Sequence, residues 1–160
     1  MGLQTQVNLY YSGAVVGDRA SHNPVVYLPT NPLAEGVVTV GNFVFQGTDP
    51  SSQVSAAGTV LAGFVERLLN YYNFALLSGG TLGIPDETPV TVATIGEFYT
   101  SFGTTAPTVG QKAFASTTDG SVSYAAAGAT VAGSLETSFV VREVRTSDNL
   151  VFISNWTPAA

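Results

Sequence analysis

A set of short motifs occurs twice in this chain, and the repetition constrains the fold more than any other feature. The first motifs recur 69 residues later and the next ones 70 residues later: Thr39-Val40-Gly41 and Phe45 as Thr108-Val109-Gly110 and Phe114, then Ala56-Ala57-Gly58, Ala62-Gly63 and Glu66 as Ala126-Ala127-Gly128, Ala132-Gly133 and Glu136. The offset grows by one, which indicates a single insertion in the loop containing Asp119-Gly120, because loops accept insertions more readily than packed strands. We therefore predict a duplicated unit, with copies at residues 39–73 and 108–144.

Each copy is too short to bury a hydrophobic core alone without disulfides or metals. The chain has no cysteine, so disulfides are excluded. The two copies are therefore expected to pack on each other within one barrel or jelly-roll-like sandwich, with Glu66 and Glu136 in matching roles.

From Gly36 onward the chain alternates short β-prone runs with turns. Three stretches are rich in β-branched and aromatic residues, at 38–45, 90–99 and 139–153. Asp119-Gly120 lies between two such runs and predicts a two-residue hairpin turn with positive φ at both positions. A mostly β fold follows.

One segment favours a helix by its spacing and a strand by its place in the repeat. Between Phe64 and Leu77, apolar residues recur at intervals of three and four, which is typical of a helix. Its counterpart in the second copy contains Phe139-Val140-Val141, which favours a strand. We predict that residues 64–70 form a strand.

Residues 1–36 differ from the rest and predict an extended N-terminal arm. Val7, Leu9, Tyr10 and Tyr11 suit one short strand. The prolines at positions 24, 29 and 32 then bias the chain toward extended conformations. The arm either straps its own domain, residues 37–160, or reaches a neighbouring subunit. Deleting residues 1–30 is expected to leave that domain folded.

Composition restricts the classes of partner. Charged residues make up 10% of the chain, against about 25% in ordinary globular domains. The mean hydropathy is +0.27, yet no apolar run is long enough to span a membrane. This combination suits a protein that keeps much of its surface against another protein. The net charge of −6, with one lysine and four arginines, excludes nucleic-acid binding.

Candidate catalytic groups are few. His22 lies near Asp18 and Ser21, but a triad is normally assembled from separate segments, so we predict a solvated loop. Glu66 and Glu136 could act as an acid–base pair only if their carboxyl groups lay at the separation that such catalysis requires, and a sequence repeat does not establish that separation. No calcium-loop, phosphate-loop or histidine-rich pattern is present. We predict no catalytic, metal or cofactor site, and no enzyme.

The aromatic residues are the candidates for binding. Tyrosine and tryptophan combine apolar area with a polar group and are enriched at protein interfaces. We predict that Tyr10, Tyr11, Tyr27 and Trp156, most of them near the chain ends, contact a protein partner or a neighbouring subunit.

Residues 36–156 resemble the capsid cement, or head decoration, proteins of tailed bacteriophages. The resemblance rests on a set of short motifs: Gly83-Ile84-Pro85, Val90-Thr91-Val92 with Gly96, Thr108–Ala115, Thr117-Thr118-Asp119-Gly120, Ala132-Gly133 and Val151–Trp156. It implies a β-barrel or jelly-roll-like domain that forms a homo-oligomer, a dimer or trimer. It also implies binding across major capsid protein subunits on the exterior of a virion assembled in the host cytoplasm.

An alternative function remains open from sequence. A tail or fibre adhesion module that binds a host glycan would have a similar composition, and a groove containing Tyr71, Tyr72 and Trp156 would favour it.

Overall fold

The computed structural model describes residues 14–68 and 82–156, and every regular element among them is a β-strand. The strands are β1 (Val26–Tyr27), β2 (Leu33–Glu35), β3 (Val38–Thr39), β4 (Phe43–Gln46), β5 (Gln53–Ser55), β6 (Leu61–Val65), β7 (Gly83–Ile84), β8 (Val92–Ile95), β9 (Glu97–Ser101), β10 (Lys112–Ser116), β11 (Val122–Ala125), β12 (Ser134–Arg145) and β13 (Leu150–Ser154). The described residues contain no helix that could cross a membrane.

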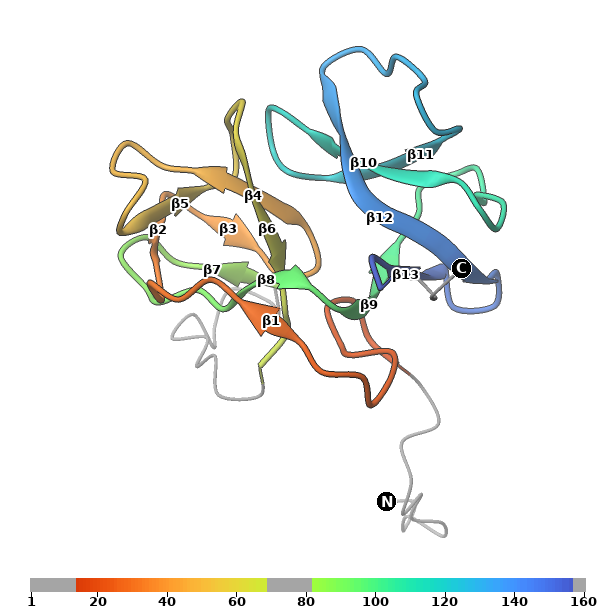
Figure 1. Cartoon of the computed structure of the whole chain (residues 1–160), viewed down its shortest axis with the longest axis horizontal. Helices are drawn as coiled ribbons and strands as arrows, with labels where there is room; N and C mark the ends of the chain where they lie inside the picture. The colour runs from red at the N-terminus through yellow and green to blue at the C-terminus, as the bar shows by residue number, and fades with distance from the viewer. Residues whose placement is uncertain (1–13, 69–81, 157–160) are drawn as a thin grey trace, which may run out of the picture.

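Two large sheets form the molecule. The first sheet has the strand order β1-β8-β6-β4-β5-β2 and the second has the order β11-β10-β12-β13-β9, while β3 and β7 pair separately. Figure 1 shows the first sheet with β3 and β7 on one side and the second sheet on the other. Neither sheet closes into a barrel, so the predicted mostly β, sandwich-like class is confirmed.

The main core lies between the two sheets. Phe43, Phe45 and Phe64 of the first sheet pack with Phe98 and Phe139 of the second. The ring centroids of Phe64 and Phe98 are 4.9 Å apart in a stacked arrangement, and those of Phe43 and Phe64 are 5.4 Å apart edge-on. The two predicted copies therefore do share one core.

A second core lies on the other face of the first sheet. Successive side chains of a strand point to opposite faces, so Val44 points away from its neighbours Phe43 and Phe45. Val44 packs with Val65 and Val92, and with Val38 of β3 and Ile84 of β7. The small β3–β7 sheet therefore contributes to covering the first sheet on this side.

The two large sheets share part of their strand order. The run β8-β6-β4-β5 in the first corresponds to β13-β12-β10-β11 in the second, and all these neighbours are antiparallel. A duplicated unit would produce this arrangement, and the duplication itself stays a prediction.

The predicted matching of Glu66 and Glu136 is wrong in its detail. Glu66 is 3% exposed and follows the end of β6, whereas Glu136 lies exposed within β12, opposite Phe114. The loop before the third strand is longer in the second copy, at 126–133 against 56–60, so the strand is displaced along its neighbour. The two glutamates at matching positions of the repeat therefore occupy different environments.

The strand prediction for residues 64–70 is right only for Phe64 and Val65 and wrong for residues 66–68. β6 includes Phe64 and Val65, residues 66–68 have no regular structure, and residues 69–77 lie outside the described residues. The described part of the helix candidate is therefore not helical.

The hairpin between β10 and β11 differs from the predicted two-residue turn. Ser116 N–H donates to Ser121 O, which closes a longer loop, and only Gly120 in the Asp119-Gly120 pair has positive φ, at +69°. A Cβ at Gly120 would lie 2.0 Å from Phe43 O. Gly120 O also accepts the Phe43 N–H at 2.9 Å, so this glycine joins the two sheets at close approach.

The described part of the arm straps its own domain. Gly17 N–H donates to Tyr99 O at 2.7 Å and Ala20 N–H donates to Glu97 O at 2.9 Å, which covers the edge of β9. β1 then pairs with β8, and β2 pairs in parallel with β5. The arm thus supplies both edge strands of the first sheet and covers the β9 edge of the second, whose other edge is β11. The division of the chain at residue 36 stays a prediction.

Candidate functional site

The arm crosses from the second sheet to the first over residues 18–27, and this crossing, here called the seam, holds two of the predicted interface residues. Tyr27 lies within it, and Trp156 contacts it from the end of the chain that follows β13. Tyr10 and Tyr11 lie outside the described residues.

Tyr27 belongs to a polar network at the seam. Its hydroxyl donates to the Glu66 carboxylate, and Arg19 donates to that carboxylate through Nε at 2.6 Å and to the Tyr27 hydroxyl through its terminal nitrogen. Partial burial and the hydrogen bond to Glu66 raise the pKa of Tyr27 to about 12. The hydrogen bond from Arg19 satisfies a carboxylate whose side chain is only 4% exposed. The hydroxyl of Tyr27 is thus engaged within the chain.

Two further contacts hold the seam. Arg67 pairs with Asp18 at 2.9 Å. The Glu97 carboxylate accepts hydrogen bonds from the Ser21 hydroxyl, from Asn23 Nδ2 at 2.8 Å and from the Ser154 hydroxyl at 2.9 Å. Burial opposes ionisation of Glu97, but these hydrogen bonds outweigh it and lower the pKa below 4.5. An ionised Glu97 therefore joins the arm to β13.

Replacing Glu97 by glutamine is expected to lower the free energy of unfolding at pH 7 by about 1 kcal/mol, since three donors lose a charged acceptor near solvent. The folded pKa is depressed, so the ionised carboxylate stabilises the fold above pH 4.5 and that stability is lost as the pH falls through the folded value. Urea unfolding of both proteins at pH 7 and near pH 3 measures this. The difference should shrink in acid; one that grows would contradict the assignment. Exposed Glu143→Gln is the control.

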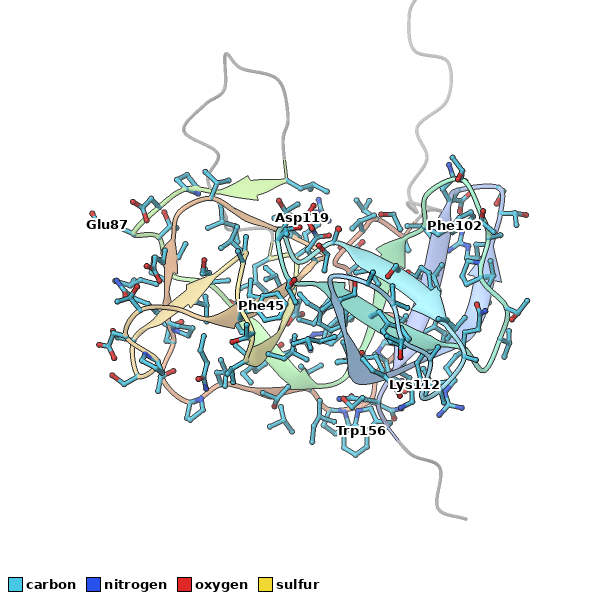
Figure 2. The ribbon with its side chains drawn as sticks, turned by 90° about the horizontal axis from the view of Figure 1, so that it is seen from above. Phe45, Glu87, Phe102, Lys112, Asp119 and Trp156 are labelled. Atoms are coloured by element: carbon cyan, nitrogen blue, oxygen red, sulfur yellow. The ribbon has the colours of Figure 1, made fainter. Side chains whose placement is uncertain are left out.

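Trp156 is fixed by hydrogen bonds on three sides. Its indole Nε1 donates to Pro24 O at 3.1 Å, and its backbone N–H donates to the Ser154 hydroxyl at 3.1 Å. Arg142 donates to the Trp156 carbonyl at 3.2 Å. Figure 2 shows Trp156 at the margin of the molecule.

An exposed apolar pair lies close in the chain to the residues that Trp156 and Asn155 bond, Pro24, Thr94 and Gly96. Val26 of β1 and Ile95 of β8 are directly opposite each other and are 44% and 36% exposed. Asn155 connects Trp156 to this pair, because its side chain donates to Thr94 O at 2.7 Å and accepts the Gly96 N–H at 2.8 Å. We call Val26, Ile95 and Trp156 the Trp156 patch.

Two cationic side chains flank the Trp156 patch. Lys112 Nζ donates to Ser138 O at 3.2 Å, and the Ser138 hydroxyl accepts from Asn155 at 3.1 Å. Arg142 contacts the Trp156 carbonyl, as described above. Figure 2 shows Lys112 and Trp156 on the same side of the molecule. Sequence analysis missed Val26, Ile95, Lys112 and Arg142, because only strand pairing and the chain end bring them together.

The candidate catalytic groups do not converge. Asp18 pairs with Arg67, and the Ser21 hydroxyl bonds to Glu97, so neither faces His22 through a hydrogen bond in the described part of the chain. Glu66 bonds to Arg19 and Tyr27, whereas Glu136 accepts the N–H of Gly128. Within residues 14–68 and 82–156, no group of acidic or histidine side chains is arranged to hold a metal.

A depression of about 310 Å3 in the described part of the chain has no aromatic side chain in its lining on which a sugar could stack. It lies under the arm, and prolines at positions 29, 32 and 50 line it with Gln46 and Gln53. Tyr71 and Tyr72 lie outside the described residues. The glycan-binding alternative therefore gains no support from this depression.

Comparisons with known proteins give one family match and one similar fold. The family model described as structural cement protein (E217 gp24/Pam3 gp6) matches residues 3–155. A solved chain from the capsid of Myoviridae phage XM1 is similar in fold, with a TM-score of 0.66 and 18% sequence identity over 97% of this chain and 98% of that one. No match was found among curated proteins.

Proposed function

Since this chain belongs to the family of phage structural cement proteins, we propose that it binds the outside of the phage head and stabilises contacts between neighbouring major capsid protein subunits. The family assignment makes it a structural protein of the phage capsid. The observation that carries the proposal is the extent of the match, which at residues 3–155 includes both sheets, the seam and the arm.

The architecture suits a protein that must bind without changing its partner chemically. The arm pairs with β8 and β5 of the first sheet and bonds to β9 of the second, so the backbone groups of those strands that face the arm are satisfied within the chain. The Trp156 patch leaves apolar side chains exposed, which is typical of an interaction surface. A homo-oligomer of such domains would engage several sites on a repeated lattice and gain affinity through multivalency.

Purified protein mixed with heads that lack it is expected to co-sediment with them and to raise their melting temperature. Binding should saturate, because the lattice offers a fixed number of sites, and heads already carrying the protein should take up no more. Sedimentation and calorimetry of the same samples measure both effects. Absence of co-sedimentation with intact, undecorated heads would refute the proposal.

A further inference from the structure

We infer that the Trp156 patch with Lys112 and Arg142 is the surface that docks on the capsid, and that its partner presents an apolar centre with carboxylates around it. This inference rests on the proposed function and specifies which face of the molecule performs it. It is carried by the apolar exposure, the fixed tryptophan and the distribution of charge.

The centre of this surface is apolar and already ordered. Val26 and Ile95 keep 44% and 36% of their surface exposed although each lies within a hydrogen-bonded strand. Trp156 has its indole N–H satisfied by Pro24 O, so the ring can be covered by a partner without burying an unpaired donor. Tryptophan is enriched among the residues that dominate interface energies, and a side chain fixed in advance loses less entropy on binding.

The two cations of the rim form no ion pair within the described residues. Within the described residues, the ion pairs are made by Arg19, Arg67 and Arg145, each with an acidic side chain. Lys112 and Arg142 instead donate to the neutral carbonyls of Ser138 and Trp156. Their charges therefore remain available to a partner.

Glu97, which senses the charge of Arg142, does not form an ion pair with it. The positive charge of Arg142 acts on Glu97 through space and contributes to lowering its pKa, but the Glu97 carboxylate is occupied by Ser21, Asn23 and Ser154. Lys112 and Arg142 form no ion pair within the described residues, so carboxylates supplied by a partner could pair with both.

The remainder of the chain restricts where an acidic partner can bind. With 11 acidic and 5 basic residues, most of the surface repels carboxylates. Glu35, Asp86 and Glu87 lie together around the loop after β7, where Asp86 accepts the Gly36 N–H and Glu87 N–H donates to Ala34 O. Figure 2 shows Glu87 at one end of the molecule, away from Lys112 and Trp156. Charge complementarity thus selects the Trp156 patch and orients the molecule on the lattice.

The test uses the full chain and undecorated heads, with binding curves at low and moderate salt. Arg142→Glu and Trp156→Ala are each expected to weaken binding by about tenfold or more, and Arg142→Glu also to reduce the salt dependence. Arg145→Glu is the matched control, because Arg145 lies on the same strand, changes the net charge equally and is occupied by Asp148 and the Tyr99 ring. It should change the affinity less than about twofold, as exposed ion pairs contribute little.

The outcomes separate the two proposals. If the natural chain binds heads and both patch variants bind as tightly as Arg145→Glu, the docking surface is wrong while the proposed function stands. If the natural chain itself does not bind, the proposed function fails. Circular dichroism confirms folding, and Arg142→Glu carries the test if Trp156→Ala does not fold. A change in the mass of the free protein, with head affinity intact, would assign the patch to contacts between copies and overturn the inference.

Discussion

Replacing Phe64 by alanine is expected to lower the free energy of unfolding by about 3–5 kcal/mol, because it leaves a cavity at the meeting point of the two sheets. The Phe64 side chain is fully buried, and its ring lies 5.4 Å from Phe43, 4.9 Å from Phe98 and 6.2 Å from Phe139, measured between centroids. No other strand can fill the space without moving a sheet. Urea unfolding followed by circular dichroism measures the loss.

Phe152→Ala is the control for this substitution. Phe152 is only partly buried and packs beside Tyr99 on the face of the second sheet away from the main core. Phe152→Ala removes the same kind of side chain but is expected to lower the free energy of unfolding less. The Phe64→Ala variant should therefore unfold at a clearly lower urea concentration than Phe152→Ala. Equal losses would show that the inter-sheet core does not dominate stability.

Deletion of residues 1–30 is expected to abolish cooperative unfolding or cause aggregation, whereas deletion of residues 1–13 should leave the domain folded. The longer deletion removes the strand pairs with β8 and β9 and exposes both edges. It also removes Arg19 and Tyr27 from the buried Glu66 carboxylate, and an unpaired buried charge costs about 3–5 kcal/mol. The sequence alone gives the opposite expectation for this truncation.

Thermal unfolding and size-exclusion chromatography of both truncations decide between the two expectations. The shorter deletion also removes Tyr10 and Tyr11, so its affinity for undecorated heads tests their predicted interface role while the contacts of the seam remain. A folded, monodisperse deletion of residues 1–30 would show that the arm is dispensable to the domain. Unchanged head binding by the shorter deletion would exclude Tyr10 and Tyr11 from the interface.

Only some residues of the candidate site can be predicted from the sequence. Tyr27 and Trp156 are predicted from their type, and the structure brings both to the seam, although the Tyr27 hydroxyl is used internally by Glu66. Val26 and Ile95 look like ordinary strand residues in the sequence. Their exposure follows from the pairing of β1 with β8, which joins segments far apart in the chain.

The repeat predicts strand formation better than it predicts the register in which the strands pair. The recurring motifs favour a strand over residues 64–70 where helical spacing favours a helix; β6 includes only Phe64 and Val65 of that range, and residues 66–68 are neither strand nor helix. They give the wrong equivalence for Glu66 and Glu136, because the longer loop at 126–133 displaces β12 along β10. Register depends on loop length and on which face is buried, and neither is visible in the motifs themselves.

The sequence by itself determined the mostly β class, the absence of a charge pattern for nucleic acid and the cement-protein family. These properties follow from composition, strand propensity and short motifs, which act within a few residues. The tertiary structure alone decided the course of the arm, the burial of Glu66 and the surface formed by Val26, Ile95, Trp156, Lys112 and Arg142. Those features need residues from opposite ends of the chain to meet, and only folding sets the distances between them.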